Sequence, residues 1–293
     1  MSIFKGSGVA LVTPFDKKGV EYNVLNDLID FHLENSTDAL IVSGTTGEAP
    51  TLTDDERIKL FKKTVIKTNG KLPVIAGTGC NNTKKAIETS LKAQDVGVDA
   101  LLVVTPYYNK TSQKGLIMHY EMIADAVDIP VMIYNVPSRT ALNVLPETLA
   151  VLSKHENIDS VKEASMDIAQ VLEVNRLCGD RLDIYSGSDE IVLPLLACGG
   201  VGVITTVGNI APKAMHDIVD LFFKGDLAGS LAMQLKLRPL INAIFADVNP
   251  IPIKKAVSLL GFAVGDVRPP LCEASKELES RLLAEMKAFG LIK

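Results

Sequence analysis

Lys162 is the residue in this sequence best suited to covalent chemistry, and it lies in the short segment Ser160–Lys162. On a solvated surface, a lysine keeps its charge and pairs with a carboxylate or extends toward water. A lysine buried at the mouth of a barrel loses the solvation of its ammonium, and the neutral amine can then attack a carbonyl carbon to form a Schiff base. Lys162 is therefore the candidate nucleophile.

Schiff-base chemistry also needs a group that moves protons, and the histidines are poorly placed for this. Three fall inside predicted helices and one near a helix C-terminus, where packing or surface roles are favoured: His32, His119, His216 and His155. Their scatter also leaves no cluster of His and carboxylate ligands for a metal-dependent aldolase. Tyr134 ends the strand next to that of Lys162 and is the better candidate, although a half-buried core tyrosine is the structural alternative.

Two further groups of residues are suited to binding anions. Arg139 offers a forked guanidinium for a carboxylate, with a surface salt bridge as the alternative. Thr45 and Thr46 lie between two glycines and can present hydroxyl and backbone N–H groups to a second anion. A tight turn in which Thr46 caps a helix is compatible with that role.

These candidates follow, or end, short apolar runs that alternate with longer segments of helical periodicity. Eight runs are predicted as strands: Val9–Val12, Ala39–Val42, Val74–Ala76, Ala100–Val104, Val131–Tyr134, Ser160–Lys162, Leu182–Tyr185 and Val201–Ile204. Ser160–Lys162 is barely apolar and is included mainly because the spacing of the others requires it. A capping box from Thr53 to Glu56 predicts a helix to about Asn69. Other helix starts are predicted at Thr83, Pro146 and Asp167.

Eight such units fit either a closed (β/α)8 barrel or an open doubly wound sheet. An open dinucleotide-binding sheet typically carries Gly-x-Gly-x-x-Gly after its first strand, where this chain has Thr13–Asp16. The sequence therefore predicts a TIM barrel over residues 1–224, with its active site at the C-terminal ends of the strands. Residues 225–293 show only helical periods and are predicted to form a C-terminal helical domain. Those periods are Ala228–Phe245, Pro252–Leu260 and Glu273–Phe289.

Composition limits the classes of function. The 293 residues are 47% hydrophobic and 22% charged, as in ordinary globular proteins. Thirty Lys and Arg against thirty-five Asp and Glu give a net charge of −5 without a basic cluster, which argues against nucleic-acid binding. The four scattered cysteines are typical of reduced cytosolic thiols. With neither a signal peptide nor a membrane-length apolar run, we expect a cytoplasmic protein that does not associate with membranes.

Five motifs at matching separations over essentially the whole chain resemble the dihydrodipicolinate synthase family of pyruvate-dependent class I aldolases. They are Gly44–Glu48, Thr105–Asn109, Tyr134–Thr140, Lys162–Ala164 and Asn249–Pro252. The resemblance implies an enzyme that condenses pyruvate with L-aspartate 4-semialdehyde to 4-hydroxy-tetrahydrodipicolinate. This reaction is the committed step of diaminopimelate and lysine biosynthesis.

The resemblance also implies catalytic roles. Lys162 would form the Schiff base with pyruvate, and Tyr134 with Thr45 would relay protons. Tyr108 would complete this relay from a neighbouring subunit, so a homo-oligomer is expected, with a tetramer favoured over a dimer. The chemistry implied needs neither a metal ion nor an organic cofactor, because the protonated imine is itself the electron sink.

The same resemblance implies substrate-binding roles. Thr45 and Thr46 would hold the carboxylate of pyruvate, and Arg139 that of the semialdehyde. Backbone groups lining the pocket would come from Gly187 and Ile204. Ala141 stands where family members commonly have glycine, and its Cβ narrows the backbone conformations open to the turn after Arg139.

A second departure concerns the feedback site of lysine-inhibited members, which tend to carry His and Glu there. This chain has Asp54, Arg57 and Lys85 at those positions, although Asn81 and Tyr107 are retained. The ammonium of an added lysine would meet Lys85 instead of a carboxylate, and like charges at short range disfavour binding. We therefore expect feedback inhibition by lysine to be weak or absent.

Two other interpretations are weighed against this one. Another Schiff-base aldolase, such as N-acetylneuraminate lyase or a 2-keto-3-deoxy sugar-acid aldolase, would share Lys162 and Tyr134 but take a different second substrate. Arg139 and the pair Thr45 and Thr46 favour the synthase. A non-enzymatic metabolite-binding or structural paralogue is disfavoured because nucleophile, shuttle and anion anchors are all present.

Overall fold

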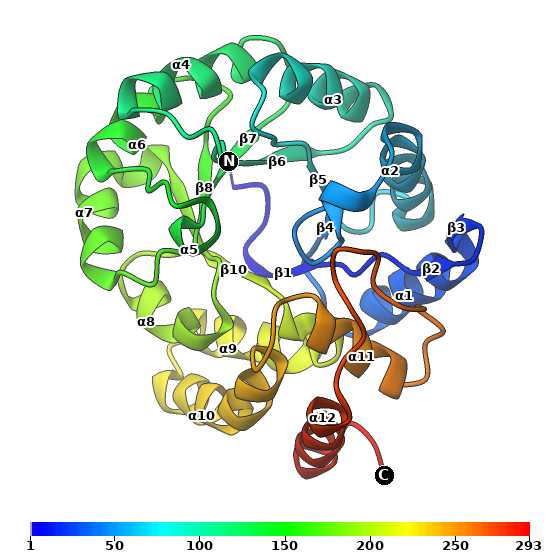
Figure 1. The fold of residues 1–293 in the computed structure, drawn as a ribbon. Helices are drawn as coiled ribbons and strands as arrows, with labels where there is room; N and C mark the ends of the chain where they lie inside the picture. Colours follow the sequence, from blue (N-terminus) through cyan, green and yellow to red (C-terminus); the bar gives the residue numbers. More distant parts are fainter. Residues whose placement is uncertain (1) are drawn as a thin grey trace.

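Eight parallel strands close into a barrel that is surrounded by helices (Figure 1), in a computed structural model that describes residues 2–293. Around the barrel each strand pairs with its neighbours in the order β1, β10, β9, β8, β7, β6, β5, β4, and β4 pairs again with β1. The strands are β1 (Gly6–Ala10), β4 (Ala39–Val42), β5 (Val74–Gly77), β6 (Ala100–Val104), β7 (Val131–Asn135), β8 (Ser160–Glu163), β9 (Asp183–Ser186) and β10 (Gly202–Thr205). The predicted (β/α)8 barrel is confirmed.

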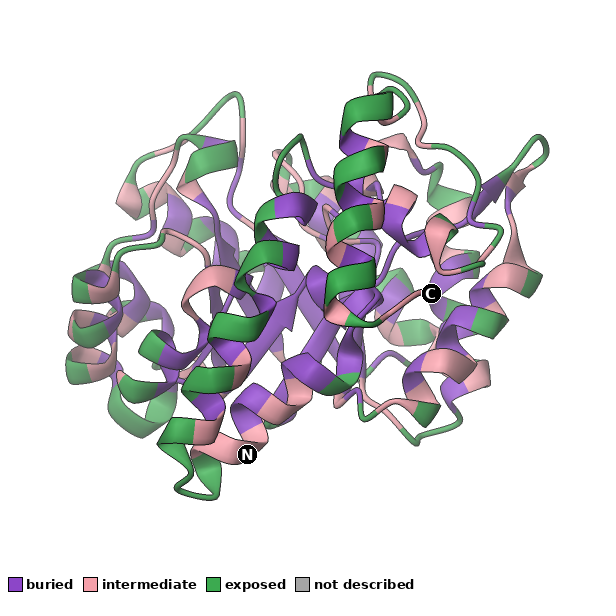
Figure 2. Ribbon diagram, turned by 90° about the horizontal axis from the view of Figure 1, so that it is seen from below, coloured by how far each residue is buried: buried purple, intermediate pink, exposed green. Residues whose placement is uncertain are grey.

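The strands are buried on both faces, which is why they read as apolar runs without alternation. Figure 2 shows them at the buried centre of the molecule, inside helices whose outer faces are exposed. One set of strand side chains fills the barrel and includes Met132, Tyr134 and Tyr185, while Ile133 packs outward against the helices. Alternation along β7 thus turns Tyr134 to the inside.

The first strand and a small hairpin differ from the prediction. β1 begins at Gly6, three residues before the predicted apolar run, because small residues allow close packing there. A Cβ built on Gly8 would lie 2.7 Å from the ring of Phe4 and 2.8 Å from Ile41 Cδ1. Two short strands, β2 (Phe15–Asp16) and β3 (Gly19–Val20), pair in an antiparallel hairpin that the apolar pattern did not predict.

The helices around the barrel are α1 (Tyr22–Glu34), α2 (Asp54–Thr68), α3 (Thr83–Asp95), α4 (Gln113–Ala124), α5 (Pro137–Thr140), α6 (Pro146–Leu152), α7 (Ile168–Cys178), α8 (Val192–Ala197) and α9 (Pro212–Phe223). Of the four helix starts predicted, those of α2, α6 and α7 are found where predicted, and that of α3 is shifted by one residue. Thr53 and Glu56 form the expected capping box on α2, with N···O distances of 3.0 and 3.2 Å. The N-cap of α3 is Asn82 rather than Thr83, which is the first helical residue. No helix within residues 2–293 is both long and apolar enough to span a membrane.

Three helices follow the barrel: α10 (Leu227–Ile244), α11 (Ile251–Leu259) and α12 (Lys276–Phe289). They confirm the predicted C-terminal helices. α10 packs on α9 and α12, and α11 packs on α10 and α12 (Figure 1). The segment after α11 returns to the barrel, where the N–H of Phe15 donates to the carbonyl oxygen of Val264 at 2.9 Å. Side chains from this part of the chain can therefore reach the barrel mouth.

Candidate active site

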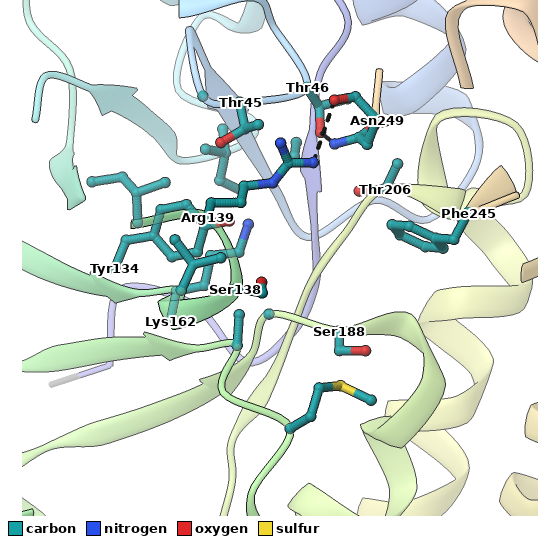
Figure 3. A pocket seen from close by; sticks show the side chains of 18 of the residues that line it. Thr45, Thr46, Tyr134, Ser138, Arg139, Lys162, Ser188, Thr206, Phe245 and Asn249 are labelled. Atoms are coloured by element: carbon teal, nitrogen blue, oxygen red, sulfur yellow. Dashed lines mark hydrogen bonds between the residues drawn. The ribbon is translucent and has the colours of Figure 1, made fainter. Parts of the chain in front are cut away.

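A cavity of about 230 Å³ lies at the C-terminal ends of the barrel strands (Figure 3). Its walls come from β7, β8, the loops after β4, β7, β9 and β10, and the segment between α10 and α11. The polar residues that line it are Thr45, Thr46, Tyr134, Ser138, Arg139, Lys162, Ser188, Glu190, Thr206 and Asn249. Both sequence-predicted anion sites and the predicted nucleophile thus meet in one place.

Lys162 and Tyr134 face each other across neighbouring strands. They are register partners in the β7–β8 ladder, and only 7% of each residue is exposed. The Nζ of Lys162 lies 4.5 Å from the centroid of the Tyr134 ring (Figure 3). The weakly apolar segment around Lys162 is therefore a barrel strand, and it carries the amine into the interior of the mouth.

Glu163 holds the end of β8 from the opposite face. Its buried carboxylate accepts hydrogen bonds from Asn135 Nδ2 at 2.9 Å, Gln170 Nε2 at 3.1 Å and the N–H of Ser165 at 2.6 Å. These bonds connect β8 to β7 and to α7. Because Glu163 is fixed outward, its neighbour Lys162 is fixed inward.

Gly187 allows the backbone after β9 to pass close to Ala164 and Lys162. A Cβ at this position would lie 2.7 Å from the Cβ of Ala164 and 3.2 Å from Lys162 Cγ. The N–H of Gly187 donates to the carbonyl oxygen of Glu163 at 2.7 Å. The chain after β9 can therefore pass directly beside the lysine stem only because this residue has no side chain.

The loop Gly44–Glu48 presents the two threonines to the cavity. Asn249 Nδ2 donates to Thr46 Oγ1 at 3.0 Å, and Thr13 Oγ1 donates to the carbonyl oxygen of Gly47 at 2.7 Å. Thr46 forms no helix cap, since α2 is capped by Thr53. The turn is thus held by residues from other parts of the chain, and the Thr45 side chain points into the cavity (Figure 3).

Arg139 lies on the short helix α5, and its side chain extends across the mouth (Figure 3). Its Nη2 donates to the carbonyl oxygen of Asn249 at 3.3 Å. Ala141 ends α5 in the left-handed region with φ 52°, a conformation that glycine adopts more easily. The turn after Arg139 therefore forms even though the Cβ of Ala141 restricts the backbone conformations open to it, and Arg139 reaches the cavity.

Asp189 positions the loop after β10. It is buried, and its Oδ2 accepts hydrogen bonds from the backbone N–H groups of Thr206 at 3.0 Å and Val207 at 2.9 Å. Burial raises the pKa of the Asp189 carboxyl group, although these hydrogen bonds oppose the shift. Gln234 of α10 donates to the Asp189 carbonyl oxygen at 2.9 Å, so a C-terminal helix supports this wall.

A second cavity of about 260 Å³ adjoins the first and shares Thr45, Tyr134 and Arg139 as walls. Arg57 and Tyr107 line its other side, and burial raises the pKa of the Tyr107 hydroxyl. The described residues that line it include two arginines and no carboxylate. Outside it, Lys85 forms an ion pair with Asp54.

Two predicted site residues lie outside the first cavity. Tyr108 is 92% exposed on the loop after β6, and Ile204 is buried among the side chains that fill the barrel. None of the four histidines lines either cavity. Within residues 2–293 no group of three or more His, Cys, Asp or Glu side chains could hold a metal ion.

Several lining residues were not singled out from the sequence. Phe245 and Asn249 come from the C-terminal helical segment. This segment, residues 225–293 of the described chain, has no strand, so the rule that site residues lie at strand ends could not locate them. Asn249 belongs to the motif Asn249–Pro252, which served only as a mark of resemblance. Glu190 follows the recognised end of β9 and is the one carboxylate among the described lining residues. Strand ends alone therefore locate most of this site, but not the part that the C-terminal chain supplies.

A (β/α)8 barrel with a buried lysine beside a tyrosine at its mouth is the architecture of the Schiff-base-forming aldolases and their relatives. The sequence matches the Dihydrodipicolinate synthetase family over residues 3–289, and the chain belongs to this family. It is 50% identical to a 4-hydroxy-tetrahydrodipicolinate synthase of Clostridium tetani, covering all of both chains. It is 53% identical to that of Caldicellulosiruptor saccharolyticus, covering 99% of each.

Among solved structures, the dihydrodipicolinate synthase of Thermotoga maritima superposes with a TM-score of 0.97 at 42% identity. That match covers 99% of this chain and 100% of the other. The likeness therefore includes the C-terminal helices as well as the barrel.

Proposed function

We propose that this chain condenses pyruvate with L-aspartate 4-semialdehyde to form 4-hydroxy-tetrahydrodipicolinate, the committed step of diaminopimelate and lysine biosynthesis. The observation that carries the proposal is the pairing of Lys162 with Tyr134 inside the barrel mouth. Full-length relatives that bear the name of this activity support it.

Lys162 acts as the nucleophile. Its neutral amine adds to the ketone carbon of pyruvate, and loss of water gives an imine that is protonated on nitrogen. The pyruvate methyl group then loses a proton, its electron pair forms the enamine, and the enamine carbon attacks the aldehyde carbon. The aldehyde oxygen takes up a proton to become the hydroxyl group, and the semialdehyde amine displaces Lys162 as the ring closes. These steps require neither a metal ion nor an organic cofactor.

Tyr134 moves the protons in these steps, together with Thr45. The phenol ring lies against Lys162 Nζ, within reach of a group bonded to that nitrogen. Both side chains line the same cavity, so protons can pass between them and a bound substrate.

Arg139 and the two threonines bind the substrate carboxylates. Thr45 and Thr46 present hydroxyl and N–H groups to the carboxylate of pyruvate, close to Lys162. Arg139 extends across the mouth above the amine and binds the carboxylate of the semialdehyde. In a chain with a net charge of −5, this local positive charge attracts two substrates that each carry a carboxylate.

Tyr108, Gly187 and Ile204 complete the proposed set. Gly187 lines the cavity through its backbone, and Ile204 supports it from the barrel interior. Tyr108 is nearly fully exposed, which suits a side chain that enters the site of a neighbouring subunit.

A homo-oligomer is therefore expected, and we favour a tetramer over a dimer. A tetramer needs a second contact face, and α10 presents three exposed leucines at intervals of four residues: Leu227, Leu231 and Leu235. One face of this helix is thus apolar and available to a further subunit.

We also propose the boundary between barrel and C-terminal domain near Lys224, where α9 ends and Gly225 turns the chain with φ 83°. A cytoplasmic location is proposed on the grounds that all four cysteines are free thiols.

Trapping of the covalent intermediate tests the proposed function. The protein is incubated with pyruvate, reduced with borohydride, digested and mapped by mass spectrometry. We expect one reduced pyruvate adduct, on Lys162, which is lost in Lys162→Ala and kept in Lys154→Ala, a change of an exposed lysine. Turnover is then measured with aspartate semialdehyde and, separately, with sugar acids. An unmodified Lys162 would contradict every mechanism that uses a Schiff base on this residue. Turnover with sugar acids alone would identify a different aldolase.

A further inference from the structure

A buried ion pair joins the C-terminal domain to the loop that carries the two threonines. Lys254 of α11 places its Nζ 2.7 Å from Glu48 Oε1, and the two side chains are 2% and 0% exposed. Nζ also donates to the carbonyl oxygen of Asp266 at 2.9 Å. Burying two charges costs much of what their attraction returns, so the pair is a weak source of stability and needs another explanation.

Glu48 is the last residue of the loop Gly44–Glu48, and its backbone is held in a strained conformation. Its φ of 55° lies in the left-handed region, which non-glycine residues seldom adopt. The second carboxylate oxygen, Oε2, accepts a hydrogen bond from the N–H of Arg268 at 2.8 Å. Both partners of this carboxylate thus come from the C-terminal domain, and both hold the end of the threonine loop.

The contacts around this pair extend it into a rigid cluster. The ring of Phe15 has Lys254 Nζ and Arg268 Cζ each 4.0 Å from its centroid. The guanidinium of Arg268 also donates to both carboxylate oxygens of Glu56, at 2.6 and 2.8 Å, and to the carbonyl oxygen of Thr51. The chain from Glu48 to the first turn of α2 is therefore fixed against the segment that follows α11.

We propose that Lys254 is a positioning residue for pyruvate binding: it holds Glu48, and through it the loop that presents Thr45 and Thr46 to the pyruvate carboxylate. This inference rests on the proposed function. Lys254 also neutralises Glu48, whose negative charge would otherwise lie two residues from Thr46 and repel an anionic substrate. The C-terminal domain thus contributes to substrate binding by positioning the loop that carries the two threonines.

Substitution of Lys254 by methionine tests the proposal, because methionine fills the space of the lysine stem without its charge. We expect KM for pyruvate to rise by about 10–100-fold, as for a binding group displaced by about 1 Å, with a smaller change in kcat. Lys255→Met is the matched control. Lys255 is the next residue of α11, but it pairs with Glu279 of α12 at 2.9 Å and lines neither cavity. Its variant should keep the wild-type KM.

Two further variants separate positioning from loss of stability. Leu282→Ala removes a buried side chain of α12 and should lower Tm without changing KM for pyruvate. The double variant Glu48→Gln/Lys254→Met removes both charges and should recover part of the affinity that Lys254→Met loses. If Lys254→Met does not fold, the same comparison is made with Glu48→Gln and the double variant.

Several outcomes would overturn the proposal. A wild-type pyruvate KM in Lys254→Met would do so, and so would an equal rise of KM in Leu282→Ala. Borohydride trapping of the wild-type protein distinguishes this failure from that of the proposed function. Without an adduct on Lys162 both proposals fall, whereas an adduct accompanied by an unchanged KM in Lys254→Met removes the positioning role alone.

Discussion

Tyr134 is packed in the barrel interior and also lines the cavity. Its ring lies 4.5 Å from Lys162 Nζ, measured to the ring centroid. The structure shows the packing role weighed for it from the sequence, and the proton-transfer role stays a proposal. Its ring can be retained while its hydroxyl is removed, so the two contributions can be measured separately.

Tyr134→Phe is expected to lower kcat by about 10²–10⁴-fold, the usual contribution of a positioned proton-transfer group. KM for pyruvate should change little, because the carboxylate-binding residues remain. Tyr120→Phe is the matched control, since Tyr120 is a buried tyrosine whose hydroxyl donates to the carbonyl oxygen of Val103 at 3.1 Å, outside the cavity. The measurement is kcat and KM for both variants by steady-state kinetics. An equal loss of kcat in the two would argue against proton transfer by Tyr134.

Residues at or just after strand ends could be predicted from the sequence, because the fold brings strand ends together at one rim. Lys162, Tyr134 and Arg139 were found in this way. Asn249 could not be, since its contacts with Thr46 and Arg139 arise from the return of the chain over 110 residues or more. Nothing local in the sequence marks such a contact.

At the scale of elements, α2 and α3 differ from what a lysine-binding site requires. Lys85 of α3 and Asp54 of α2 form an exposed ion pair that lowers the pKa of the Asp54 carboxyl group. The adjoining cavity offers Arg57 and Arg139 but no carboxylate among the described residues that line it. An ammonium group therefore finds no negative partner there, and two arginines lie nearby.

We accordingly expect lysine to inhibit this enzyme weakly or not at all. Initial rates measured over a lysine titration should stay near the uninhibited value at millimolar concentrations, and calorimetry should show no tight binding. Lys85→Glu supplies a comparison, because a carboxylate at position 85 adds the partner that an ammonium group needs. Strong inhibition of the unaltered protein at sub-millimolar lysine would contradict the expectation.

The elements themselves show where pattern reasoning is reliable. Capping residues located the starts of α2 and α7 because they act on neighbouring backbone groups, and a proline at the first helical position located that of α6. β1 was placed too late because its first residues, Gly6–Gly8, are small rather than apolar. The requirement that a barrel close, rather than local hydrophobicity, made β8 a strand.

At the scale of the whole molecule, the exposed position of Tyr108 links the oligomeric state of the protein to its activity. If this side chain completes the site of a neighbouring subunit, each active site contains Lys162 from one chain and Tyr108 from another. In a two-fold symmetric pair, a subunit that lacks one residue can then be rescued by a partner that lacks the other. A chain that supplied both residues to its own site could not be rescued in this way.

Complementation between Tyr108→Phe and Lys162→Ala therefore tests the shared site. Each variant alone should have little activity, but subunits that are unfolded, mixed in equal amounts and refolded should regain about a quarter of the wild-type rate. Half of the pairs are then mixed, and each mixed pair has one intact site of two. Mixing Tyr134→Phe with Lys162→Ala is the control, because Tyr134 and Lys162 lie in the same chain's cavity and the mixture restores no site. Recovery in the control, or none in the test, would show that Tyr108 does not act across the interface.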